Sequence, residues 1–167
     1  MAGVNFTVVV TSALGVALCL YAINVEQNSV RDATYRAFCD FSPYASCSKV
    51  LTSTQSRLLT YFGIAAPDGH FDFPNTYLGL FFYAFMLTFP RGRQYCHCLY
   101  TLAAAAAMAS SIYLAYVLYA VLHDFCLVCV TSYVLNLILL AVTLFSRSES
   151  RQLTPAKRRA ANKKKIR

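Results

Sequence analysis

The stretch FCLVCVTSYVLNLILLAVTLFS, residues 125–146, contains no Asp, Glu, Lys or Arg. A helix of about 20 apolar residues crosses the hydrocarbon core of a bilayer, so this stretch predicts a membrane span. Uncharged stretches at about 4–25, 74–90 and 96–121 predict three more spans. Only 13% of the 167 residues are charged, whereas soluble domains carry about 25%. The sequence therefore predicts an all-α fold, a polytopic membrane four-helix bundle formed by residues 1–146.

The first apolar stretch has a second interpretation, as a cleaved signal peptide. A signal peptide carries basic residues ahead of its apolar core and small residues at its cleavage site. No Lys or Arg precedes this run, and the segment from Tyr21 to Val25 makes a poor cleavage site. We therefore expect the stretch to remain as the first span.

Positive charge is distributed unevenly between the two sides of the predicted bundle. The tail, residues 147–167, is rich in Lys and Arg, and Arg91 and Arg93 lie between the second and third spans. Cytosolic segments carry an excess of these residues, so we expect a basic cytosolic tail and both termini in the cytosol. The final Lys164-Lys165-Ile166-Arg167 resembles a dilysine retrieval signal, or is simply more basic tail. Topology thus accounts for the net charge of +8, and no nucleic-acid partner is expected.

The long loop, residues 26–73, lies on the opposite side in this topology. Apolar residues recur among polar ones between Ser46 and Phe62, which predicts a short amphipathic helix on the membrane interface. Pro67-Asp68-Gly69 is a turn signal further along. We expect the loop to fold as a cap over the mouth of the bundle.

Four of the seven cysteines are expected on this same side of the membrane. Cys39 and Cys47 lie in the long loop, and Cys126 and Cys129 begin the last span. The latter two are three residues apart and share a helix face, with Asp124 as a plausible N-cap. A helix N-terminus favours the reactive thiolate, whereas burial in apolar surroundings opposes it.

A redox role is the favoured interpretation of these thiols, and a structural disulfide or half of a metal site are the alternatives. Zinc is disfavoured because His70 and His123 are isolated, so we expect no metal. The other cysteines fit simpler roles. Cys19 is expected to pack within the first span, while Cys96 and Cys98 are expected to be spectators or acylation sites.

A tyrosine and an asparagine follow Cys129 on the same helix face. Tyr133 lies four residues beyond it and Asn136 seven. The Tyr133 hydroxyl could donate a hydrogen bond to an oxygen of the molecule being reduced, or could bond to a neighbouring helix.

Several short motifs together resemble the vitamin K epoxide reductase family, in particular its four-helix animal members. They are Cys39-Asp40, Ser46-Cys47-Ser48, Pro74-Asn75 and Asp124-Phe125-Cys126-x-x-Cys129-Val130-Thr131-Ser132-Tyr133. The resemblance runs from the first span to the end of the fourth. Ala65–Phe73 and Leu51 depart from the family pattern. The resemblance implies a reductase of vitamin K quinone and its 2,3-epoxide in the endoplasmic reticulum membrane, with no tightly bound cofactor.

The resemblance also implies a role for each matching position. Cys129 would be the nucleophile, Cys126 its disulfide partner, and Cys47 the shuttle to Cys126. Cys39 would be the thiol reached by a lumenal thioredoxin-fold donor. The remaining expected residues form the pocket for a lipid-soluble naphthoquinone and for coumarin-type inhibitors: hydrogen-bonding Asn75 and Tyr133, and the apolar wall residue Phe82.

Two other functions are compatible with the same pattern. In the first, a quinone oxidises the thiols, and the enzyme forms disulfides in secretory proteins. The reduction potentials decide the direction of electron flow. In the second, the protein is a non-enzymatic four-span scaffold whose two cysteine pairs are fixed disulfides.

Overall fold

The structure, a computed structural model, describes residues 2–32, 35–40, 46–53 and 74–165, with side chains only up to residue 146. All regular structure in these ranges is helical: α1 (Ala2–Arg31), α2 (Cys47–Leu51), α4 (Asn75–Leu87), α5 (Phe89–Val117), the π-helical turn η2 (Leu118–Leu122) and α6 (Leu127–Lys165). Three helical segments are long and apolar enough to cross a membrane: Gly3–Arg31, Phe89–Leu122 and Leu127–Ser146. The predicted all-α membrane bundle is confirmed.

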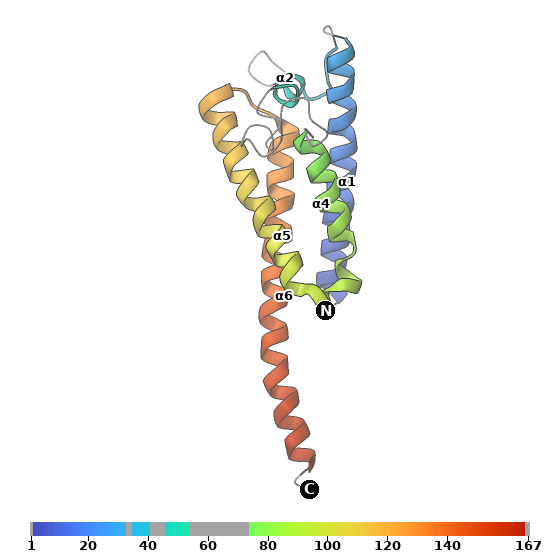
Figure 1. Ribbon diagram of the computed structural model, residues 1–167, viewed down its shortest axis with the longest axis vertical. Coiled ribbons are helices and arrows are strands. Elements are labelled where there is room, and N and C mark those ends of the chain that lie inside the picture. Colours follow the sequence, from blue (N-terminus) through green and yellow to red (C-terminus); the bar gives the residue numbers. More distant parts are fainter. Residues whose placement is uncertain (1, 33–34, 41–45, 54–73, 166–167) are drawn as a thin grey trace, which may run out of the picture.

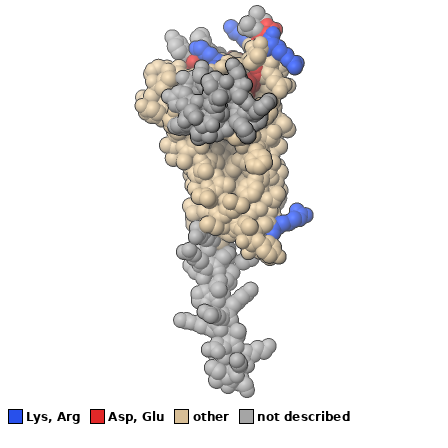
Figure 2. All heavy atoms as spheres, in the orientation of Figure 1, with Lys and Arg blue, Asp and Glu red and all other residues tan. Residues whose placement is uncertain are grey.

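The long helices form a bundle with α2 at one end (Figure 1). Helix α1 packs against α4 and α6, and α5 packs against α6. The N-terminus lies at the end away from α2, and α6 continues beyond that end toward the C-terminus. On the face shown in Figure 2, coloured Lys, Arg, Asp and Glu atoms lie at the two ends of the described surface, with an uncharged belt between them. This is the surface expected of a membrane-embedded bundle.

Helix α4 is shorter than the expected span at 74–90. It covers 13 residues and is followed by the C-cap residue Thr88, whose hydroxyl donates a hydrogen bond to the Phe85 carbonyl at 2.7 Å. Pro90 lies in the first turn of the next helix, where its missing N–H does no harm. Proline lacks the donor that would have continued α4, so the chain turns here.

The segment carrying Arg91 and Arg93 is helical and belongs to α5. The expected start of the third span, residue 96, instead marks a kink, because Cys96 has non-helical backbone angles (φ −125°, ψ 38°). Helix α4 and the apolar part of α5 are therefore joined by a short helical corner.

Helix α2 is the beginning of the amphipathic segment predicted in the long loop. The Ser46 side chain accepts a hydrogen bond from the Lys49 N–H at 3.4 Å and caps the first turn. The helix ends at Leu51, and the hydroxyls of Thr52 and Ser53 donate to the Ser48 and Val50 carbonyls at 2.8 and 2.7 Å. Residues 54–73, with the expected turn at Pro67-Asp68-Gly69 and the segment Ala65–Phe73, lie outside the described residues.

Candidate active site

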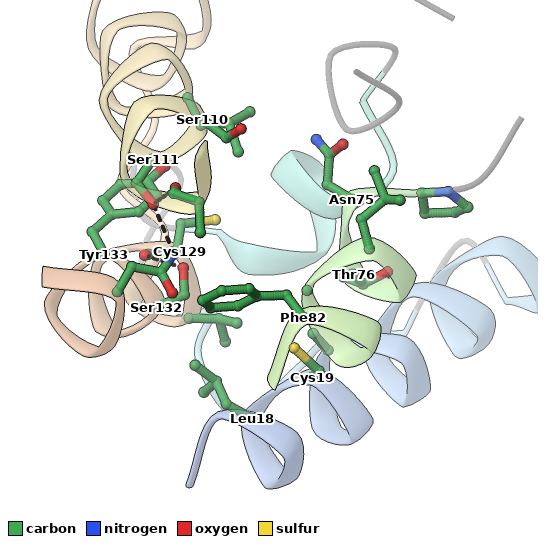
Figure 3. A pocket seen from close by; sticks show the side chains of 18 of the residues that line it. Leu18, Cys19, Asn75, Thr76, Phe82, Ser110, Ser111, Cys129, Ser132 and Tyr133 are labelled. Atoms are coloured by element: carbon green, nitrogen blue, oxygen red, sulfur yellow. Dashed lines mark hydrogen bonds between the residues drawn. The ribbon is translucent and has the colours of Figure 1, made fainter. Parts of the chain in front are cut away.

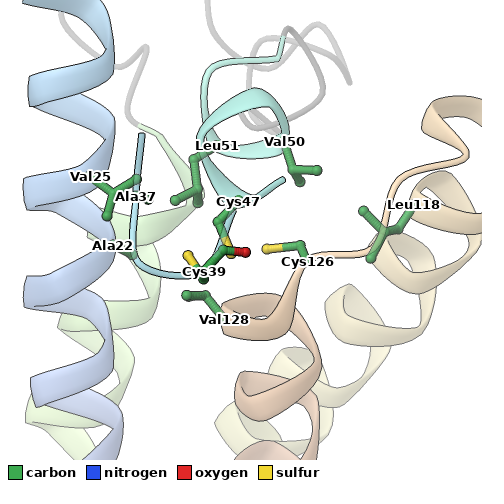
Figure 4. Close-up of a cluster of buried hydrophobic side chains, with 10 residues drawn as sticks. All are labelled: Ala22, Val25, Ala37, Cys39, Cys47, Val50, Leu51, Leu118, Cys126 and Val128. Atoms are coloured by element: carbon green, nitrogen blue, oxygen red, sulfur yellow. The ribbon is translucent and has the colours of Figure 1, made fainter. Parts of the chain in front are cut away.

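The structure brings four cysteines together at the α2 end of the bundle. Cys39, Cys47 and Cys126 belong to one buried cluster, with 6%, 0% and 0% of their surfaces exposed, and Cys129 packs against it. Figure 4 shows the three buried sulfurs in a row between α1 and the start of α6. The loop pair and the helix pair therefore lie on the same side of the bundle. All seven cysteines of the chain are thiols in this structure.

The four thiols lie in series. The Cys47 sulfur lies within 4.8 Å of the Cys39 sulfur, its thiol donates to the Cys39 carbonyl at 3.8 Å, and it interacts with the Cys126 thiol on the other side. Cys126 is in turn paired with the Cys129 thiol. Each sulfur thus already lies beside the one with which it would exchange a disulfide.

Cys126 itself occupies the N-cap position of α6. Its carbonyl accepts the first helical hydrogen bond, from the Val130 N–H at 3.0 Å, and its sulfur accepts the Cys129 N–H at 3.3 Å. The expectation that Asp124 caps this helix is wrong. Asp124 is 8% exposed and forms an ion pair with Lys49 of α2, Nζ to Oδ2 3.1 Å. The left-handed backbone of His123 (φ 51°) turns the chain between η2 and Asp124.

The environment of the buried thiols favours their neutral form. Burial, followed by the hydrogen bond with Cys47, raises the pKa of Cys39 to about 12. The hydrogen bond with Cys126, reinforced by burial, raises the pKa of Cys47. The hydrogen bond with Cys129 raises the pKa of Cys126 and outweighs the opposing bonds from Cys47 and the Cys129 N–H. Burial and thiol pairing therefore outweigh the effect of the helix N-terminus, and the three buried thiols favour the protonated form.

Asp40 ties the two loop cysteines to each other. Its carboxylate accepts the Ala37 N–H at 2.9 Å, the Ser48 N–H at 3.2 Å and the Ser48 hydroxyl at 2.7 Å. Burial opposes the charged form of Asp40, but these hydrogen bonds outweigh it and lower its pKa. Donor atoms of Cys39, Asp40 and Cys47 lie within 4.8 Å of one another, close enough for one metal ion. Because the carboxylate already accepts three hydrogen bonds, we assign it a structural role.

A pocket of about 430 Å³ opens beside the end of the thiol series. All four residues that were expected at a substrate site line it: Cys129, Asn75, Tyr133 and Phe82. In Figure 3, Asn75 of α4 and Tyr133 of α6 lie on opposite sides, with the Phe82 ring and the Cys129 sulfur between them. Cys39, Cys47 and Cys126 are not among the lining residues, so only the last thiol of the series reaches the pocket.

The pocket wall includes a hydrogen-bonded polar group that joins three helices. The Tyr83 hydroxyl of α4 donates to Asn136 Oδ1 at 2.8 Å, and Asn136 Nδ2 of α6 donates to the Ser111 hydroxyl of α5 at 2.8 Å. The sequence placed Asn136 on the face of Cys129 but did not identify Tyr83 or Ser111. Their only signal was that each is a polar group within an uncharged span.

Small residues make room for the pocket. Ala103, Ala106 and Ala107 of α5 line it, and their short side chains leave open space beside this helix. Cys19 also lines the pocket but belongs to α1 and stands apart from the thiol series. Cys96 and Cys98 are exposed near the start of α5 and are not part of the thiol series.

A membrane-crossing helical bundle in which paired thiols lead to a largely apolar pocket defines the class of membrane thiol oxidoreductases. Residues 6–144 match the Vitamin K epoxide reductase family. The chain is 38% identical over 128 residues to Vitamin K epoxide reductase complex subunit 1 of Mus musculus, covering 73% of this chain and 77% of that protein. The Rattus norvegicus subunit gives the same identity and coverage. The chain therefore belongs to the vitamin K epoxide reductase family, and it is a thiol-dependent, multi-pass membrane oxidoreductase.

Proposed function

We propose that this protein reduces vitamin K 2,3-epoxide and vitamin K quinone in the endoplasmic reticulum membrane. The observation that carries the proposal is the unbroken series of thiol contacts from Cys39 to Cys129, which ends on a pocket also lined by Asn75 and Tyr133. The pocket is large enough for a bicyclic ring system, and its lining is mostly apolar. Both features suit a head group that arrives from lipid.

The chemistry requires only a dithiol. Cys126 and Cys129 supply two electrons and two protons as they form a disulfide; the epoxide oxygen leaves as water, or a quinone becomes a hydroquinone. Cys129 is the attacking sulfur because it alone of the series lines the pocket. Negative charge develops on the substrate oxygens, and hydrogen bonds from Asn75 and Tyr133 stabilise it in a water-poor site. This transfer of two electrons and two protons needs no tightly bound cofactor or metal.

The loop pair then restores the dithiol by exchange. Cys47 attacks Cys126, releases Cys129 and forms a mixed disulfide; Cys39 attacks Cys47, releases Cys126 and closes a loop disulfide. A thioredoxin-fold donor in the lumen reduces that loop disulfide. Phe38, beside Cys39, is 94% exposed and offers an apolar ring where such a donor would bind. With the donor and the thiol series on the lumenal side, both termini of the chain lie in the cytosol.

The decisive experiment compares two cysteines that line the same pocket. With vitamin K epoxide and a small membrane-permeant dithiol, Cys129→Ser should abolish turnover, whereas Cys19→Ser should retain it. Full turnover by Cys129→Ser would refute the assignment. Equilibrating the protein with thiol–disulfide buffers of set potential measures the reduction potential of its thiol pairs. That potential decides between quinone reduction and quinone-driven disulfide formation.

The relay and the pocket have their own tests. Cys39→Ala should lose activity with a thioredoxin-fold protein donor and keep it with the permeant dithiol; equal loss with both would contradict the relay. Tyr133→Phe and Asn75→Ala should weaken binding of quinone and of coumarin-type inhibitors. Tyr116→Phe is the matched control, since Tyr116 is 65% exposed and outside the pocket lining.

A further inference from the structure

The loop thiols face a conflict in the structure. A protein donor must reach Cys39 or Cys47, yet only 6% and 0% of these residues are exposed. Cys47 is at the same time held against Cys126, the contact that passes electrons inward. One position of α2 therefore serves the inward step, and a second must serve the donor.

One ion pair lies where it would stabilise one of these two positions of α2 over the other. Lys49 follows Cys47 on α2, Asp124 precedes Cys126, and the two join at 3.1 Å. The pair thus flanks the Cys47–Cys126 contact.

The two partners differ in their access to water. The Lys49 side chain is 64% exposed and the Asp124 side chain 6%. Lys49 can leave the pair for water, whereas Asp124 would then be a buried carboxylate without its cation, which is unfavourable. The pair therefore favours the docked position of α2. Val50 and Leu51 of the same helix line the pocket, so docking also completes the pocket wall.

Asp40 keeps the loop pair intact whichever position α2 takes. Its three hydrogen bonds join the Cys39 segment at Ala37 to α2 at Ser48. Cys39 and Cys47 can thus move together and remain within exchange distance of each other.

We propose that the Lys49–Asp124 ion pair is a latch that positions α2, holding Cys47 against Cys126 when closed and exposing the loop thiols to a protein donor when open. The proposal rests on the proposed electron relay, but the position of α2 can be measured without any substrate. Lys49 and Asp124 are positioning residues and take no part in the chemistry.

The test measures how fast a water-soluble maleimide alkylates Cys47 in the reduced full-length protein in nanodiscs, in a background with Cys96→Ser and Cys98→Ser. Lys49→Met and Asp124→Asn should each speed alkylation about tenfold, which corresponds to about 1.4 kcal/mol. The double variant should add less than about twofold, because the pair is already broken. Added salt should speed alkylation of the parent protein but not of Lys49→Met.

Three controls separate a latch from a general loosening. Lys49→Arg keeps the charge and should restore the slow rate, and Arg36→Met removes another exposed cation of the same loop and should change nothing. Cys19, 7% exposed on α1, should stay unreactive throughout. Alkylation of Cys19 as fast as that of Cys47 would show unfolding of the bundle and overturn the proposal.

A second measurement follows the inward step. With Cys39→Ser and Cys129→Ser, the Cys47–Cys126 mixed disulfide formed by a mild oxidant should appear at rates within about twofold in Lys49→Met and Lys49→Arg, because a tenfold rise in a minor open fraction leaves most molecules docked. Failure of Lys49→Met to form this disulfide, or alkylation of Cys47 within twofold across all charge variants, would refute the latch. Neither readout depends on vitamin K turnover, so failure of the latch and failure of the proposed function are distinguishable.

Discussion

The hydrogen bond between Tyr83 and Asn136 makes a quantitative prediction about the bundle. Tyr83 is 2% exposed and Asn136 9%, and their bond joins α4 to α6. Hydrogen bonds between membrane helices contribute about 0.6 kcal/mol on average and at most about 1.7 kcal/mol. This bond is short and buried, so we expect Tyr83→Phe to cost about 1 kcal/mol. Asn136→Ala also loses the bond to Ser111 and should cost roughly 1–3 kcal/mol.

A double-mutant cycle isolates the bond itself. The free energy of unfolding, measured by denaturant titration in mixed micelles, should show a coupling of about 1 kcal/mol between Tyr83→Phe and Asn136→Ala. Thr143→Val is the matched control, because the Thr143 hydroxyl donates only within α6, to Leu139 and Leu140. Thr143 lies about 10 Å further along the helix, so its coupling to Tyr83→Phe should be below about 0.5 kcal/mol. Equal couplings in the two cycles would refute the reasoning.

Three other predictions concern single residues. Ser12 is 0% exposed and its hydroxyl has no hydrogen-bond partner among the described residues, so Ser12→Ala should stabilise the protein by about 1 kcal/mol; a lower melting temperature would contradict this. A methyl group on Gly15 would meet the Tyr83 ring, so Gly15→Ala should cost about 1–3 kcal/mol, and less in a Tyr83→Leu background. The lowered pKa of Asp40 means that the folded state binds its proton less readily than the unfolded state. The stabilisation that the Asp40 carboxylate provides is therefore present above its ordinary pKa of 3.8 and is lost as the pH falls through the lower pKa of the folded state. The difference in the free energy of unfolding between the parent protein and Asp40→Asn should therefore shrink on acidification.

The bundle and the pocket were largely predictable because both depend on simple periodicities. Uncharged stretches of the right length located the long helices. Helical spacing placed Cys129 and Tyr133 on one face, and the structure finds both on the wall of one pocket. Asn75 and Phe82 joined them through a motif resemblance, since nothing in their spacing relates α4 to α6. Their roles in binding stay predictions.

Features that depend on tertiary contacts were not predictable in the same way. Asp124 suited an N-cap by position, but Lys49 from a distant loop competes for its carboxylate. The helix N-terminus suggested a thiolate at Cys126, whereas pairing with Cys129 and burial raise its pKa. Spacing cannot show such pairings, because the partners come from separate segments of the chain.

The shortness of α4 has a consequence for the surrounding lipid. Its 13 residues span about 20 Å, whereas the hydrocarbon core of a bilayer is about 30 Å thick. A membrane helix shorter than the hydrocarbon core is accommodated by local thinning of the bilayer or by flanking residues that reach toward the interface. Asn75 and Phe82 lie on this same helix. A locally thinned leaflet beside these two residues would shorten the route of a lipophilic ligand between the membrane surface and the pocket.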